Sequence, residues 1–113
     1  MPATVTLAAV ISSGTTTSSA VDLATVTSQS GFLGFSMPAA FTGASISFQV
    51  SLDDVTYQAL NDSANSLVSI TVTVSTNYGF KQDVRAALKS WRFIKIVSAS
   101  SEGADRTITL WTK

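Results

Sequence analysis

The stretch Ser45-Ile46-Ser47-Phe48-Gln49-Val50-Ser51 alternates strictly between polar and apolar side chains. Alternation with a period of two is the pattern of a β-strand with one face against a core and the other face in water. We expect Ile46, Phe48 and Val50 to point inward, and the Ser and Gln side chains to point outward. This segment therefore predicts a half-buried strand in a β-sheet.

Two adjacent carboxylates follow this strand in the sequence Leu52-Asp53-Asp54. Aspartate side chains accept hydrogen bonds from nearby backbone amides, so the pair predicts a tight turn, with residues 55–60 as the hairpin partner. Asp53 and Asp54 could instead ligate calcium or form a glycosidase-like pair. The chain lacks the repeated Asp spacing of a calcium loop, and the turn is therefore the favoured interpretation.

Six further segments carry a strand pattern, separated by polar turns. They cover residues 4–11, 18–23, 31–37, 67–74, 91–98 and 106–112. Residues 82–90 are the only helix-like stretch, because Val84 and Leu88 lie four apart. We predict one domain over residues 1–113, an all-β antiparallel sandwich or jelly roll of about eight strands with one short helical turn.

The predicted core follows from the apolar phase of each strand. In residues 91–98 the bulky pair Trp91 and Phe93 is placed inward, so including Ile96 requires either a β-bulge near Lys95 or a strand that is covered on both faces. In residues 67–74 the inward side chains are expected to be Val68, Ile70, Val72 and Val74. The core residues predicted from all strands are Ile46, Phe48, Val50, Ile70, Val72, Trp91, Phe93, Ile96, Ile108 and Leu110.

The chain contains neither Cys nor His. Their absence removes disulfides, thiolate metal sites, the commonest general base and the commonest zinc ligand. A serine nucleophile would need a lysine as its base, and the neighbours Lys89 and Ser90 have no catalytic motif around them. We therefore predict that the protein is not an enzyme and that it holds no catalytic residue, cofactor or metal.

Charge is scarce and unevenly distributed along the chain. Charged residues make up 12% of the sequence and the formal net charge is zero. Residues 1–80 contain four acids and no base, whereas residues 81–113 contain seven bases and three acids. Such an asymmetry is satisfied by internal pairing, or it produces a bipolar surface that docks onto copies of the chain or onto a scaffold.

The bipolar interpretation has specific candidate residues. Lys81, Arg85 and Lys89 recur at four-residue spacing and would share one face of a short helix. We expect that basic ridge to meet Asp53, Asp54 or Asp62 of a neighbouring subunit, or an acidic patch on a larger particle. Nucleic acid is not expected as a partner, because the few basic residues are offset by acids.

Trp111 is the aromatic residue that falls on the polar side of its strand. Its neighbours Ile108 and Leu110 form the inward pair, so Trp111 shares a face with Thr107 and Thr109. An exposed Trp is a suitable anchor for a protein interface or for stacking against a sugar. The alternative is that the C-terminal segment is covered by its own fold.

The N-terminal region has a distinct composition. Residues 1–6 and the Ser/Thr-rich loop 12–17 carry no charge. We expect both segments to be ordered by neighbouring subunits, with residues 1–6 as an exchangeable arm. The N-terminus lacks a basic signal-peptide region, and no segment approaches the roughly 20 apolar residues of a membrane span.

Two resemblances extend these predictions. Residues 41–60, followed by 91–98 and 104–110, resemble the hairpin and aromatic strand of discoidin-type, galactose-binding-like sandwiches. Most of the chain also resembles small structural proteins of tailed bacteriophages, notably around residues 13–18, 37–42 and 104–107. The resemblance implies a virion component that binds copies of itself and a phage capsid or tail protein, in the first place a capsid decoration (cement) subunit. The alternative is a tail, collar or fibre-associated module that binds a carbohydrate or receptor; no membrane contact is implied.

Overall fold

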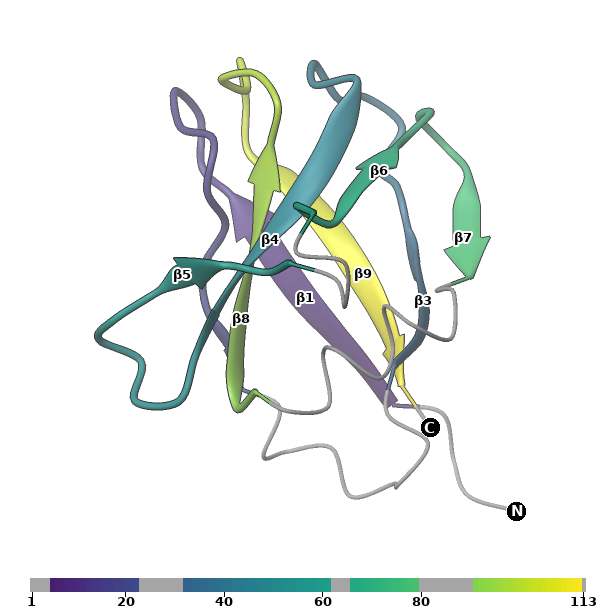
Figure 1. Cartoon of the computed structure of the whole chain (residues 1–113). Helices are drawn as coiled ribbons and strands as arrows, with labels where there is room; N and C mark the ends of the chain where they lie inside the picture. The colour runs from purple at the N-terminus through teal and green to yellow at the C-terminus, as the bar shows by residue number, and fades with distance from the viewer. Residues whose placement is uncertain (1–4, 23–31, 62–65, 80–90, 113) are drawn as a thin grey trace.

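The computed structural model describes residues 5–22, 32–61, 66–79 and 91–112, and this part of the chain forms nine β-strands (Figure 1). The strands are β1 (Val5–Ile11), β2 (Val21–Asp22), β3 (Phe32–Ser36), β4 (Ser45–Ser51), β5 (Gln58–Ala59), β6 (Ser69–Thr71), β7 (Asn77–Gly79), β8 (Phe93–Ser98) and β9 (Arg106–Thr112). Strands β4 and β9 have the bounds that the sequence predicts, because their alternation is uninterrupted.

The strands form two sheets. One sheet has the order β1-β9-β3-β7, and the other has the order β2-β8-β4-β5 with β6 also paired to β4. All the pairings between these strands are antiparallel. The prediction of an all-β antiparallel sandwich is confirmed.

The core lies between the two sheets and is built from the inward phase of each long strand. In β4, Ile46, Phe48 and Val50 are buried as the opening alternation predicts. The facing sheet contributes Ala9, Ile11, Phe35, Ile108 and Leu110. At about 25 cal/mol for each Å² of apolar surface removed from water, these side chains are the main stabilising contribution to the fold.

The predicted orientation of β8 is wrong. Ile94 and Ile96 are fully buried, whereas Phe93 points to the outer face and is half-buried, with the guanidinium of Arg92 lying 5.0 Å from its ring centroid. The pairing of β8 with β4 runs from Phe93 to Ser98 without a register shift, so no bulge near Lys95 is needed. Two β-branched side chains at alternate positions, rather than the aromatic residues, set the inward phase.

Trp91 precedes β8 and is partly buried against the core, so it is not an inward residue of that strand.

The segment 67–74 is less regular than its sequence suggests. Strand β6 covers only Ser69–Thr71, although Val68 and Val72 are buried and Ile70 packs against the core. Val74 is exposed, because the chain turns there and Ser75 adopts a positive φ of 55°. The helix-like stretch 82–90 lies outside the described residues.

The start of β1 bears on the predicted arm. Val5 and Thr6 pair with Thr112 and Trp111 of β9, so the expectation that residues 1–6 are ordered by neighbouring subunits is wrong for these two residues. Residues 1–4 lie outside the described part of the chain.

The two phenylalanines on opposite faces provide a test of this core. Replacing the buried Phe48 with Ala should lower the free energy of unfolding by about 3–5 kcal/mol, because it removes a full ring and leaves a cavity. Phe93→Ala should cost only about 1 kcal/mol, since half of that ring already contacts solvent. Chemical denaturation of both variants measures the difference. Equal losses would contradict the assignment of Phe93 to the outer face.

Candidate interaction face

Trp111 lies on the outer face of the four-stranded sheet, as the sequence predicts. Ile108 and Leu110 of β9 are fully buried, whereas Trp111 is 39% exposed. Thr107 and Thr109, which share its phase, are exposed and half-buried respectively. Strand alternation thus presents the indole to solvent from a rigid element in the middle of the sheet.

A hydrogen-bond relay fixes the orientation of this indole. The Nε1–H of Trp111 donates to Oγ of Ser36 at 2.6 Å, and the Ser36 hydroxyl donates to Oδ1 of Asn77 at 2.7 Å. The three residues come from the neighbouring strands β9, β3 and β7. Because the relay uses the indole N–H and the Ser proton, it leaves the Asn77 amide group as a donor beside the ring.

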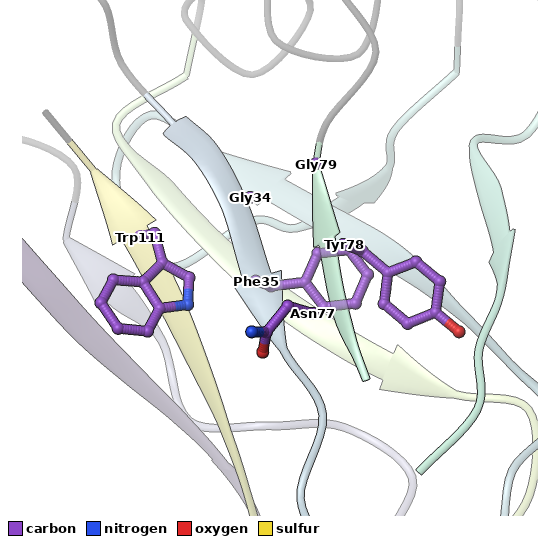
Figure 2. Close-up of a pocket in the computed structure, with 6 residues that line it drawn as sticks. All are labelled: Gly34, Phe35, Asn77, Tyr78, Gly79 and Trp111. Carbon is purple, nitrogen blue, oxygen red and sulfur yellow. The ribbon is translucent and has the colours of Figure 1, made fainter. Parts of the chain in front are cut away.

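A shallow depression of about 310 Å³ lies beside Trp111 (Figure 2). Its lining residues are Gly34, Phe35, Asn77, Tyr78, Gly79 and Trp111. Gly34 is required there, because a Cβ at that position would overlap with the carbonyl oxygen of Tyr78. Gly34 pairs with both Trp111 and Gly79, so two residues without side chains lie in line with the indole and leave space on its open side.

Aromatic packing on the inner face of the sheet lies beneath the depression. The rings of Phe35 and Tyr78 stack with their centroids 5.1 Å apart and their planes inclined at 19°. The Tyr78 hydroxyl accepts a hydrogen bond of 2.7 Å from the backbone N–H of Thr73, which ties the edge strand β7 to the segment between β6 and β7.

The surface around the depression carries no charge among the described residues that face outward from this sheet. Its side chains are small, neutral or apolar: Ala8, Val10, Ser36, Asn77, Thr107 and Thr109. A neutral face with one aromatic anchor can contact an apolar protein segment or a sugar ring without desolvating a charge.

The predicted turn at Asp53 is confirmed. Its Oδ1 accepts hydrogen bonds from the hydroxyl of Ser51 at 2.8 Å and from the backbone N–H groups of Val55 and Thr56 at 2.9 and 3.0 Å. The bonds from Thr56, Val55 and Ser51 stabilise the ionised form and lower the pKa of Asp53 to about 2. Asp53 is therefore a structural cap of the β4–β5 hairpin.

Asp54 and Tyr57 close the other side of the same turn. Asp54 has a positive φ of 61°, and its carboxylate accepts a hydrogen bond from the Tyr57 hydroxyl. The ammonium of Lys95 lies 4.2 Å from the Tyr57 ring centroid, in a cation–π arrangement. Desolvation, together with the Asp54 carboxylate, raises the pKa of Tyr57 to about 12, so the phenol stays protonated.

The structure does not bring the predicted interface residues together. Trp111 belongs to the four-stranded sheet, whereas Asp53 and Asp54 lie in a hairpin of the other sheet (Figure 1). Lys81, Arg85, Lys89 and Asp62 lie outside the described residues. Part of the charge asymmetry is met by internal pairing, since Arg92 contacts Asp22 with 3.4 Å between Nε and Oδ1.

Glu102 is the important polar residue that the sequence analysis missed. It is 1% exposed, and its carboxylate accepts hydrogen bonds from the backbone N–H groups of Thr42 and Gly43 at 2.7 and 2.9 Å. The Ser98 hydroxyl donates at 2.8 Å and Nε of Arg106 at 3.1 Å. No sequence pattern marks Glu102 as buried; the only signal is Arg106 four residues later.

The backbone of Glu102 also orders the loop 12–17. Its carbonyl accepts a hydrogen bond from Gly14 N–H at 2.7 Å, and its N–H donates to the Thr15 carbonyl at 3.0 Å. Asp105 adds a bond from Ser13 N–H at 2.8 Å. The expectation that this loop is ordered by neighbouring subunits is therefore wrong, because contacts within the fold hold it.

Two opposing effects act on the pKa of Glu102. Burial alone would raise it, but the hydrogen bonds from Thr42, Ser98, Gly43 and Arg106 stabilise the carboxylate and hold the pKa below its usual value. The group is therefore ionised and fully paired near neutral pH.

Comparison with known proteins gives a match of fold. No protein family and no curated protein sequence matches the chain. Among solved structures, the SPBc2 prophage-derived protein YomS is similar, with a TM-score of 0.57 and 12% sequence identity over 99% of this chain and 96% of that protein. The chain therefore shares the fold of a prophage-derived protein over nearly its whole length.

Two further observations concern the described residues alone. They contain no group of three or more acidic side chains placed to hold a metal ion. They also contain no helix of sufficient length and hydrophobicity to cross a membrane.

Glu102→Gln tests the buried carboxylate. At pH 7 the variant should be less stable by about 2–4 kcal/mol, because it loses charge-assisted bonds and leaves Arg106 without its partner. The pKa of Glu102 is lower in the folded protein than its unfolded value of about 4.5. The ionised carboxylate therefore stabilises the fold above pH 4.5, and this stability is lost as the pH falls through the folded pKa. The difference in stability between wild type and variant should therefore shrink as the pH falls below about 4.5. Urea denaturation at several pH values measures it, and Asp53, present in both proteins, cancels. A difference that is independent of pH would contradict the role given to the ionised form.

Proposed function

We propose that the chain is a non-enzymatic structural protein of a bacteriophage particle, a capsid decoration (cement) subunit that associates with copies of itself and docks on the shell. The observation that carries this proposal is the uncharged outer face of the β1-β9-β3-β7 sheet, with Trp111 held open at its centre. Such a face suits contact with a neighbouring protein, because little polar surface is desolvated when it is covered.

Two further observations support a phage particle as the setting. The whole chain has the fold of a prophage-derived protein. The low content of charged residues and zero net charge suit a protein whose surface is largely covered by neighbours, since soluble monomers usually keep a net charge. The proposed location is therefore the virion.

A tail, collar or fibre-associated module that binds a carbohydrate or receptor is the second candidate. The depression beside Trp111 favours it, because an exposed indole next to the Asn77 amide offers both a stacking surface and a hydrogen-bond donor for a sugar. Neither the shared fold nor the lining residues specify the galactose-binding-like class, so the sugar site of that class is not part of this candidate function.

The copy number in purified particles distinguishes the two candidates. A decoration subunit should be present in hundreds of copies, in a fixed ratio to the major capsid protein, because it covers a repeating lattice. A tail or collar module should be present in about a dozen copies or fewer. Quantitative mass spectrometry of intact particles measures this ratio, and glycan-array binding by the isolated protein would support the second candidate.

Charge reversal tests the predicted basic ridge. The triple variant Lys81→Glu, Arg85→Glu and Lys89→Glu should be incorporated poorly into particles, while its circular dichroism spectrum stays that of the folded domain. Exposed ion pairs contribute only about 0–1 kcal/mol each, so the effect should be greatest at low ionic strength. Particle loading at low and high salt is the measurement. Normal loading at low salt would show that the ridge is not an assembly element.

A further inference from the structure

The tip of the β4–β5 hairpin exposes two apolar side chains. Leu52 is 65% exposed and Val55 is 81% exposed, and they flank Asp53 and Asp54 in the turn. Figure 1 shows this loop projecting from one side of the sandwich, away from β3 and β7. Nothing among the described residues covers either side chain.

The tip is held in a fixed conformation. Oδ1 of Asp53 accepts three hydrogen bonds within the turn, and Oγ of Ser51 accepts two more from the backbone N–H groups of Asp53 and Asp54 at 3.2 and 3.0 Å. A preorganised loop loses less conformational entropy when it binds than a flexible one does. The apolar pair is thus presented as a rigid protrusion.

The acids of the tip do not oppose its burial in a neutral site. The Asp53 carboxylate has its three donors within the turn, and the Asp54 carboxylate is bonded to the Tyr57 hydroxyl. Docking of the apolar side chains can therefore leave both carboxylates bonded and at the solvated rim. This limits the desolvation cost that an unpaired charge would impose.

The same chain carries a matching recess. The depression beside Trp111 has Gly34, Gly79, the indole and the Asn77 amide on its outer side, and none of its lining residues is charged. It opens on the four-stranded sheet, whereas the hairpin belongs to the other sheet. One molecule can therefore use its tip and its depression at the same time, with two different neighbours.

We propose that Leu52 and Val55 at the hairpin tip of one copy dock into the depression beside Trp111 of the next copy. This inference rests on the self-association in the proposed function and specifies the surfaces that carry it. The contact joins two different patches, so it propagates head to tail and closes into a ring where the rotation between copies allows it. The tip alone is smaller than a standard stable interface of roughly 1,600 Å², so a single contact is weak in solution and gains strength from multiple contacts on a particle.

Analytical ultracentrifugation of the full chain between about 0.01 and 1 mM, the range suited to weak contacts, tests the proposal. The wild type should associate with rising concentration, and its tryptophan emission should shift to the blue as Trp111 becomes covered. Leu52→Asp and Val55→Asp should each weaken association at least tenfold. Leu67→Asp is the matched control, because Leu67 is 52% exposed but lies away from the turn and should leave association unchanged.

The depression is tested with Trp111→Ala and, in case that variant folds poorly, with Asn77→Arg, which places a long charged chain in the recess. Either change should weaken association as much as the tip variants do. A tip variant and a depression variant each keep one intact surface, so mixing them in equal amounts should restore a one-to-one dimer. A contact between identical patches would not be restored by mixing.

Three outcomes would overturn the proposal: a wild type that stays monomeric throughout the range, tip or depression variants that associate normally, or a mixture that remains monomeric. These outcomes are distinct from failure of the proposed function. Association in solution without incorporation into particles would contradict the decoration role and leave the head-to-tail contact intact. If the tip and depression variants are incorporated into particles as well as the wild type is, the head-to-tail contact would be contradicted and the decoration role would be left intact.

Discussion

The buried carboxylate of Glu102 is the constraint on which the end of the sandwich depends. A charge removed from water is costly unless it is fully paired, and here four donors surround it. Thr42 and Gly43 precede β4 and Ser98 ends β8, whereas Arg106 begins β9 and Gly14 follows β1. Glu102 thereby joins segments from both sheets, through its carboxylate at Thr42, Gly43, Ser98 and Arg106 and through its backbone carbonyl at Gly14. Gly43 shows how tight this arrangement is, because a Cβ there would overlap with the Ser98 hydroxyl.

In this arrangement the outer faces of the sheets contribute neither to the core nor to the Glu102 network. The core between the sheets supplies the apolar burial, and the Glu102 network orders the loops at one end. Side chains on the outer face of the four-stranded sheet are therefore not needed for the core, although Trp111, Ser36 and Asn77 join their three strands by hydrogen bonds. These side chains are Ser, Thr, Ala, Val and Asn and carry no charge, and Trp111 is the large aromatic side chain among them.

The sequence predicts the features that depend on one strand and misses those that depend on several. Alternation along residues 45–51 and 106–112 predicts β4 and β9 with their observed bounds and places Trp111 on the outer face. The same reasoning fails for Phe93, because the large aromatic side chain suggests one phase for β8 while the alternation of Ile94 and Ile96 sets the other. The depression requires Gly34 and Gly79 from other strands to lie in register with Trp111, and the Glu102 site requires several loops to meet. Neither condition is visible in a local pattern.

The positions of the tip and the depression have a consequence for any assembly built from them. A two-fold dimer would need the tip and the depression to lie within one patch, so that each tip reaches the depression of the other copy. Here the two belong to different sheets. When the tip of one copy pairs with the depression of the next, the contact is head to tail and the row of copies has a direction. Such a row closes into a ring, or it follows a surface that sets its curvature. In the proposed decoration role, a phage shell is such a surface. The weakness expected of one apolar tip in one shallow recess then becomes useful, since subunits that bind weakly in solution remain separate until the particle brings many contacts together.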